Sequence, residues 1–283
     1  MDTATKKVWF VTGASKGLGL VLVKQLLEQG HAVAATSRNQ QELLDAVGTT
    51  TSSFLPLQVN LTDESSVQRA IEATIQTLGG LDVVVNNAGY GLSGSLEELT
   101  DEESRNNFDI NVFGSLNVIR QAMPQLRKQK AGHILNISSV GGFFGSFPGW
   151  GIYCATKFAV EGFSESLAAE VKAFGVHVTI VEPGYFRTNF LTSDSMGLPK
   201  NQIDAYKEVR ESQQFHQQEM NGNQPGDPEK AAAAMIRITT EPNPPLHLFL
   251  GQDAYDLART KLNAVQQELE QWKELTVSTG FTA

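Results

Sequence analysis

The pattern that most restricts the fold of this chain is an alternation of short apolar runs with longer amphipathic stretches. Residues 18–29, 64–78, 101–127 and 153–174 carry apolar side chains at three- and four-residue spacing, which predicts helices. Alternation of strands and helices predicts an α/β fold, with a doubly wound parallel sheet of about seven strands and helices on both faces. The predicted strands lie at 7–11, 31–37, 53–59, 81–87, 132–138, 176–183 and 246–251.

The 283 residues, 41% of them hydrophobic, suffice for one large core, and no repeat or linker divides residues 1–184. We therefore expect a single dinucleotide-binding and catalytic domain over 1–283. Residues 190–228 are polar and rich in helix breakers, which predicts an excursion with one or two helices that covers a substrate. Residues 252–283 are expected to form a C-terminal helical extension, which is interpreted as a docking helix, with a lid or an oligomer contact as alternatives.

Charge and cysteine content exclude several classes of protein. The net charge is -9 and no run of like charge reaches five, which argues against a nucleic-acid or anionic membrane surface. The single cysteine excludes an internal disulfide framework and fits a reducing cytoplasm. No apolar segment is long enough to span a bilayer or to serve as a signal peptide, and five scattered histidines offer no metal site. We expect a cytoplasmic protein without a membrane span.

The first predicted strand runs directly into "TGASKGLG", residues 12–19, and then into a helical pattern. Glycines at 13, 17 and 19 permit a sharp turn and leave room for a pyrophosphate at the N-terminus of the helix. The spacing differs from the usual G-x-G-x-x-G, so an ordinary glycine-rich connector is an alternative on spacing alone. Its position between strand and helix favours a dinucleotide site and a Rossmann-like sheet.

Six motifs in chain order resemble those of the short-chain dehydrogenase/reductase family. They are "TGASKGLG", "NNAG" (86–89), "NVFG" (111–114), "ISS" (137–139), "YCATK" (153–157) and "EPG" (182–184). The segment from "SVGGFFG" through "YCATKFAVEGFSESLAAE" is similar to hydroxysteroid dehydrogenases, retinol dehydrogenases and bacterial carbonyl reductases. The resemblance covers about residues 6–190 and implies an oxidoreductase that assembles as a homodimer or homotetramer.

Tyr153 and Lys157 are four residues apart, so a helix would place both side chains on one face. A free tyrosine has a pKa near 10, and a neighbouring ammonium together with an oxidised nicotinamide would lower it toward neutrality. Tyr153 is then expected to donate a proton in ketone reduction and to accept one in alcohol oxidation. The resemblance implies that Lys157 also holds the hydroxyls of the nicotinamide ribose.

Ser139 ends a predicted strand fourteen residues before Tyr153 and is expected to bind the substrate carbonyl oxygen. The family usually has about thirteen residues there, so Ser138 is the alternative. The resemblance implies that Asn111 kinks its helix and helps to carry a relay water to Lys157. Four aromatic residues of the intervening loop are interpreted either as core or as an apolar wall for the substrate; they are Phe143, Phe144, Phe147 and Trp150.

The second predicted strand ends in "ATSRN", where an NAD enzyme usually has an acid to bind the ribose. This chain has Ser37 and Arg38 instead, and with Lys16 they predict a site for the 2'-phosphate of NADP(H). Asn60 stands where the family has an aspartate that meets the adenine amine, a bond its amide oxygen could also accept. The full set of expected cofactor residues is Gly13, Ser15, Lys16, Gly17, Leu18, Gly19, Ser37, Arg38, Asn60, Leu61, Asn87, Ala88, Gly89, Tyr153, Lys157, Pro183, Gly184 and Thr188.

These residues together predict an NADPH-dependent, reversible reduction of a ketone or aldehyde to an alcohol. The expected partner is a small apolar carbonyl or alcohol substrate, and no metal is expected. The alternative is a non-catalytic NADP-binding regulatory protein of the same fold, because a fold does not by itself imply an activity.

Overall fold

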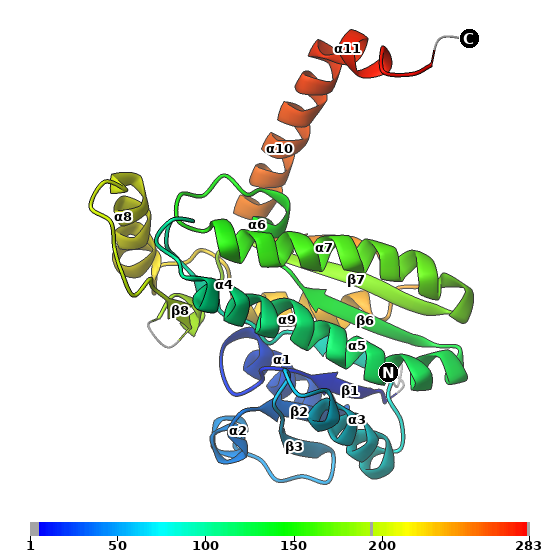
Figure 1. The fold of residues 1–283 in the computed structure, drawn as a ribbon. Helices are drawn as coiled ribbons and strands as arrows, with labels where there is room; N and C mark the ends of the chain where they lie inside the picture. Colours follow the sequence, from blue (N-terminus) through cyan, green and yellow to red (C-terminus); the bar gives the residue numbers. More distant parts are fainter. Residues whose placement is uncertain (1–5, 193–194, 282–283) are drawn as a thin grey trace.

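The computed structural model describes residues 6–192 and 195–281 and contains a seven-stranded, wholly parallel sheet (Figure 1). The strand order is β3-β2-β1-β4-β6-β7-β9. All seven strands predicted from the sequence are present, which confirms the Rossmann-like α/β fold. Their bounds are β1 Val8–Val11, β2 Ala32–Ser37, β3 Phe54–Gln58, β4 Val83–Asn86, β6 Gly132–Ile137, β7 Val176–Pro183 and β9 His247–Leu250.

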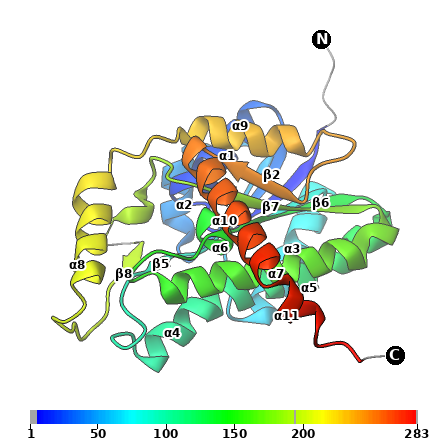
Figure 2. The same ribbon diagram turned by 90° about the horizontal axis from the view of Figure 1, so that it is seen from above.

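Two hydrophobic cores lie on opposite faces of this sheet because successive side chains of a strand point to opposite sides. In β1, Trp9 and Val11 enter one core while Phe10 enters the other. The first core is covered by α1 (Gly17–Glu28), α2 (Gln40–Val47) and α9 (Pro228–Ile238), and the second by α3 (Glu64–Leu78), α5 (Gly114–Gln129) and α7 (Gly151–Val171). Figure 2 shows these two layers of helices around the sheet.

The strand order reverses next to β1, which pairs with β2 on one side and with β4 on the other. Connections that run in opposite directions from this point leave a crevice at the carboxyl ends of the strands. The loops after β1, β2, β4, β6 and β7 therefore meet at one edge of the sheet, where the predicted site residues lie.

The predicted helix over 101–127 is divided in the structure. Helix α4 (Asp101–Phe108) passes through a π-helical turn, η1 (Asp109–Phe113), into α5. A π turn inserts an extra residue without breaking the helix, so apolar periodicity alone could not detect it. The sequence analysis also missed α2, whose start is capped by the side chain of Asn39.

The excursion and the C-terminal extension lie outside the main sheet. The excursion holds a 3-10 turn η3 (Asn189–Leu191), strand β8 (Met196–Gly197), helix α8 (Lys207–Gln214) and a π-helical turn η4 (Phe215–Met220). Strand β8 pairs with β5 (Gly91–Leu92) in a separate two-stranded sheet. After β9, α10 (Gln252–Gln271) and α11 (Lys273–Val277) extend away from the body (Figure 1).

Among the described residues, none of the helices combines the length and the apolar character that crossing a membrane requires.

Candidate active site

A cavity of about 780 Å³ opens at the carboxyl ends of the strands. Nearly every residue predicted to bind the cofactor or to act in catalysis contributes to its wall. Two predicted residues, Gly19 and Asn111, lie just behind the wall. The loops that the strand order brings together therefore line one continuous space, from the glycine-rich loop to Tyr153.

The glycine-rich loop is built by close backbone contact. Gly13 and Gly17 have φ angles of 65° and 60°, a region that favours glycine. A Cβ atom on Gly13 would lie 2.7 Å from the Cα of Ala88, and one on Gly19 would lie 2.7 Å from the Gly13 carbonyl oxygen and 2.5 Å from the side-chain nitrogen of Asn87. Both positions exclude a side chain for steric reasons.

Thr12 and Asn87 fasten this loop to the end of β4. The Thr12 hydroxyl accepts hydrogen bonds from the backbone N–H groups of Asn87 and Ala88, both at 3.0 Å. The Asn87 side-chain amide donates to the carbonyl oxygens of Thr12 at 2.9 Å and Gly13 at 3.0 Å. The sequence analysis missed Thr12, although its place directly after β1 indicates such a contact.

Ser37, Arg38 and Lys16 line the same end of the cavity. Ser37 is buried at the end of β2 and its hydroxyl accepts a hydrogen bond from the Asn39 N–H at 3.2 Å. Arg38 and Lys16 are exposed, so their long side chains border the cavity from the solvent side. The structure thus brings together the three residues from which a 2'-phosphate site was predicted.

Asn60 lines the cavity, but its amide oxygen is already used within its own turn. That oxygen accepts hydrogen bonds from the backbone N–H of Thr62 at 3.1 Å and from the Thr62 hydroxyl at 2.9 Å. A carbonyl oxygen has two lone pairs, so the expected bond from an adenine amine would compete with these contacts. The neighbouring Leu61 packs against Gly114 and its carbonyl oxygen accepts from Asn117.

Tyr153, Ser139 and Lys157 lie together where α7 passes the end of β6. The Ser139 hydroxyl lies within reach of the Tyr153 hydroxyl. The Lys157 ammonium lies 5.8 Å from the centre of the Tyr153 ring and donates to the Ile137 carbonyl oxygen at 2.8 Å. The Ser138 hydroxyl instead donates a hydrogen bond to the Lys157 carbonyl oxygen at 3.4 Å. Of the two serines considered, the structure places Ser139 against Tyr153.

The expected lowering of the Tyr153 pKa is not what the residues of the chain produce. Burial raises the pKa of Tyr153 above its usual value near 10, and the hydrogen bond from Ser139 opposes this only in part. Burial also lowers the pKa of Lys157 to about 8, while the nearby Glu161 carboxylate favours its charged form. Tyr153 therefore stays protonated at neutral pH, and Lys157 loses its charge within reach of physiological pH.

Asn111 lies in the π-helical turn η1, behind the wall of the cavity. Its side-chain amide donates to the Tyr90 carbonyl oxygen and to the Thr156 hydroxyl, both at 3.1 Å, and accepts from the Tyr90 N–H at 3.1 Å. A Cβ atom on Gly89 would lie 3.1 Å from the side-chain oxygen of Asn111 and 3.7 Å from the Lys157 ammonium nitrogen. The π turn thus aims Asn111 at the same small space as Lys157.

An apolar compartment adjoins Tyr153. Trp150, Cys154, Leu191 and Met196 form a buried cluster with it, against which Phe147, Phe190 and Met220 pack. Of the four loop aromatics in question, Phe147 and Trp150 line the cavity. Phe143 packs on Phe249 instead, and Phe144 packs on the outer side of Phe147, with ring centres 5.3 and 5.4 Å apart.

A polar pair that the sequence analysis missed borders this compartment. The Tyr185 hydroxyl and the His216 Nε2 atom are 2.9 Å apart, and the His216 ring lies 4.8 Å from that of Trp150. The His216 Nδ1 atom is 2.6 Å from the Ser212 carbonyl oxygen, so Nδ1 carries the proton and Nε2 accepts from Tyr185. Histidine spacing in the sequence gave no signal, because Tyr185 and His216 meet only in the folded chain.

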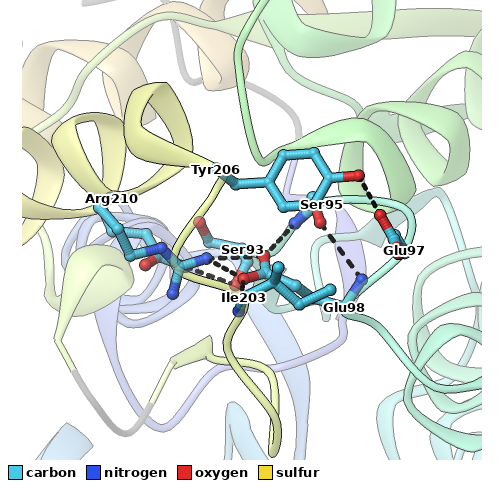
Figure 3. A network of polar contacts seen from close by, with 8 residues as sticks. Ser93, Ser95, Glu97, Glu98, Ile203, Tyr206 and Arg210 are labelled. Carbon is cyan, nitrogen blue, oxygen red and sulfur yellow. Dashed lines mark hydrogen bonds and ion pairs between the residues drawn. The ribbon is translucent and has the colours of Figure 1, made fainter.

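The excursion is fastened to the loop after β5 by a polar network (Figure 3). Both oxygens of the fully buried Glu98 carboxylate lie 2.6 Å from one Arg210 nitrogen, and one of them accepts from the Ile203 N–H at 2.7 Å. Beside it, the Tyr206 hydroxyl donates to Glu97, and Gln213 donates to the Ser93 carbonyl oxygen at 3.0 Å. We refer to the Glu98–Arg210 pair as the latch.

Two buried carboxyl groups lie where α7 packs on β7. Glu161 of α7 and Glu182 of β7 contact each other, and His247 Nδ1 lies 2.8 Å from Glu182 and 3.7 Å from Glu161. Burial, with mutual repulsion, raises the pKa of Glu161 to about 8, and burial raises that of Glu182 to about 8. At neutral pH such a pair is stable when it shares a proton.

Comparison with known proteins gives consistent matches. The family described as "short chain dehydrogenase" matches residues 7–197. A 3-ketodihydrosphingosine reductase from Bacteroides thetaiotaomicron is 38% identical over 247 residues, which cover 87% of this chain and 88% of that protein. The crystal structure of a short-chain dehydrogenase from Streptomyces avermitilis is 38% identical, with a TM-score of 0.89 and coverage of 97% and 100%.

Two further solved structures carry a cofactor. The structure described as "ElxO with NADP Bound" is 26% identical, with a TM-score of 0.70 over 87% of this chain and 96% of that one. A short-chain dehydrogenase/reductase from Burkholderia phymatum, in complex with NAD, is 20% identical, with a TM-score of 0.81 and coverage of 95% and 97%. The fold therefore serves both cofactors among these proteins.

Proposed function

The chain belongs to the short-chain dehydrogenase family, and from this premise we propose that it reduces a ketone or aldehyde to the alcohol with NADPH, in a reversible reaction. The observation that carries the proposal is the joint placement of Tyr153, Ser139 and Lys157 in one wall of a cavity that continues to the glycine-rich loop.

The residues present fit a dinucleotide. Gly13 and Gly17 have no side chains, so a ligand can approach the backbone of the loop. Helix α1 begins at Gly17, and the N–H groups of its first turn suit a pyrophosphate. Ser37, Arg38 and Lys16 would hold the 2'-phosphate, and the absence of an acid at the end of β2 favours NADPH over NADH. Lys157 and Thr188 would hold the nicotinamide half, which supplies a hydride when bound.

The chain's own residues would supply the proton. The Ser139 hydroxyl would donate a hydrogen bond to the substrate carbonyl oxygen and stabilise the negative charge that develops there. Tyr153, protonated at neutral pH because burial raises its pKa, would transfer its hydroxyl proton to the same oxygen. Lys157, in its charged form, would stabilise the phenolate that remains.

This assignment predicts how the reduction depends on pH. The Lys157 pKa of about 8 lies below that of a free lysine, so the positive charge is present below pH 8 and is lost as the pH rises through that value. We expect kcat/KM for reduction to fall above about pH 8.

The shape and chemistry of the second compartment favour an apolar substrate. The wall next to Tyr153 consists mainly of apolar side chains, which are those of Phe147, Trp150, Phe190, Leu191 and Met196. The similarity to a protein named as a 3-ketodihydrosphingosine reductase adds a long-chain ketone to the candidates. A panel of aryl ketones, steroids, retinal and a long-chain 3-ketone should be tested by the loss of NADPH absorbance.

The alternative is a regulatory protein that binds NADP without catalysis. If the chain is an enzyme, it should turn over at least one ketone of the panel, and the variant Tyr153→Phe should lose this activity. A chain that binds NADPH tightly but turns over none of these ketones, nor the matching alcohols with NADP⁺, would favour the regulator.

A further inference from the structure

Helix α10 carries a row of apolar side chains along one side, which we call the stripe. The rest of the chain packs only against the beginning of this helix. The first two turns pack on the body, where Ala254 and Ala258 are buried and α10 lies against α6 (Val140–Phe143). The Asp253 carboxylate accepts a hydrogen bond from the Tyr185 N–H at 2.7 Å, which fastens the start of the helix beside the active site. Beyond Ala258 the helix projects into solvent (Figure 1).

The stripe continues along the projecting part. Leu262, Leu269 and Trp272 retain 54%, 59% and 56% of their surface, and Val265 lies between them on the same side. Side chains of this size are seldom left exposed in a row on a soluble helix without a partner.

The spacing of the stripe is that of a helix pair. Tyr255, Ala258, Leu262, Val265, Leu269 and Trp272 follow one another at steps of three, four, three, four and three residues. This 3.5-residue period places them at the a and d positions of three heptads, which is the seam of a two-stranded coiled coil. A helix that merely docks on a globular body has a wider and less regular apolar face.

We propose that α10 pairs in antiparallel orientation with α10 of a second copy of this chain, and so forms a two-fold symmetric dimer. In this register Leu262 faces Val265 of the second copy and Tyr255 faces Trp272 of the second copy. Leu269 of the second copy lies next to Ala258, a small residue that its own chain already buries. Each contact occurs twice, because a two-fold interface repeats every contact.

Charges flanking the seam fit the same register. Lys261 and Glu268 occupy the g positions, and antiparallel pairing sets Lys261 opposite Glu268 of the second copy, twice. Arg259 at an e position faces the uncharged Gln266 of the second copy. No like charges meet across the seam, and the two bodies lie at opposite ends of the helix pair.

The charge of α10 disfavours a membrane as the occupant. The helix carries four acidic side chains against two basic ones, which an anionic lipid surface would repel. An alternation of both signs beside the seam suits a protein helix with the complementary pattern.

The test is the mass in solution of the full chain, measured by light scattering and by sedimentation across a range of concentrations. The double variant Leu262→Glu with Leu269→Glu should raise the dissociation constant at this interface at least about a hundredfold, and so halve the mass. Both side chains are exposed within one copy, so circular dichroism should remain unchanged. Gln267→Glu, on the opposite side of α10, is the matched control and should leave the mass unchanged.

Reversal of charge tests the orientation. Lys261→Glu and Glu268→Lys should each weaken the dimer, and the variant with both changes should restore it, because each new pair is again of opposite sign. A monomeric wild type, a mass unaffected by the double leucine variant, or failure of the combined charge variant to recover would overturn the antiparallel pairing. So would a monomer that sediments with phosphatidylcholine and phosphatidylserine vesicles.

Discussion

The two ends of the active-site cavity are built in different ways. At the glycine-rich loop, the wall is mostly backbone: Gly13 approaches Ala88, and Thr12 and Asn87 join two neighbouring strands. At the other end the wall is made of side chains from the excursion, such as Phe190, Leu191 and His216. Arg210 and Gln213 fasten the excursion to residues about a hundred positions earlier.

This difference indicates that one end of the cavity selects the cofactor and the other end selects the substrate. A backbone wall tolerates few substitutions, because a side chain at Gly13 or Gly19 would clash with its neighbours. A wall of side chains on a latched segment can change its shape by substitution while the sheet stays the same. Selectivity for the cofactor should therefore respond to changes at β1 and β2, and selectivity for the substrate to changes in 190–228.

The largest effect is expected at the boundary between the two ends. Tyr153→Phe removes the proton donor and should lower kcat about a hundredfold to ten-thousandfold, while the dissociation constant of NADPH changes little. Steady-state kinetics and fluorescence titration measure the two. Tyr90→Phe, in the same cavity but outside the group of Tyr153, Ser139 and Lys157, is the control. Near wild-type turnover in Tyr153→Phe would refute the mechanism.

A change at the backbone end should alter the cofactor and leave the choice of ketone alone. Charge-assisted hydrogen bonds from Arg38 and Lys16 should give NADPH a preference over NADH on the order of a hundredfold in kcat/KM. Ser37→Asp should shrink or reverse that preference, because its carboxylate repels the 2'-phosphate and offers NADH a partner for its ribose hydroxyls.

Ser37→Ala removes the hydroxyl without adding charge and serves as the control. A wild type that prefers NADH, or the same cofactor ratio in Ser37→Asp as in the wild type, would show that the end of β2 does not select the cofactor.

A change at the latch should alter the choice of ketone and leave the binding of the cofactor unchanged. Arg210→Met leaves the buried Glu98 carboxylate without its cation and should loosen α8 from the loop after β5. We expect KM for bulky ketones to rise roughly tenfold with an unchanged dissociation constant for NADPH. Arg105→Met breaks the exposed Arg105–Asp101 pair and is the control. If KM stays constant for small and bulky ketones alike, the excursion does not shape the substrate site.

The smallest effect is expected in the stability of the fold, at the buried carboxyl group of Glu182. Glu182, protonated in the folded chain up to a pKa of about 8 and ionised in the unfolded chain above about 4.5, stabilises the fold at low pH. That stability is lost as the pH rises from about 4.5 to about 8. Glu182→Gln keeps the shape without the charge and should flatten the decline of the melting temperature over this range, by a few degrees. A decline as steep in Glu182→Gln as in the wild type would contradict this assignment; Glu170→Gln, at an exposed position of α7, is the control.

Prediction from the sequence succeeded best where a residue's environment is set by its immediate neighbours along the chain. All seven main strands follow from local apolar runs, and the glycine-rich loop follows from glycines between a strand and a helix. The roles assigned to single residues remain predictions. In the chain alone, burial raises the pKa of Tyr153, and its lowering by an ammonium together with an oxidised nicotinamide stays a prediction.

By itself, then, the sequence determined the order of strands and helices, the glycine turns, and the spacing of Tyr153 and Lys157 on one helix, since periods of two and 3.6 residues are properties of the local backbone. Only the tertiary structure decided that Ser139 rather than Ser138 faces Tyr153, that Tyr185 meets His216, and that Glu98 anchors Arg210. Such contacts join residues far apart in the chain, and their geometry depends on how strands and helices pack, which no local pattern records.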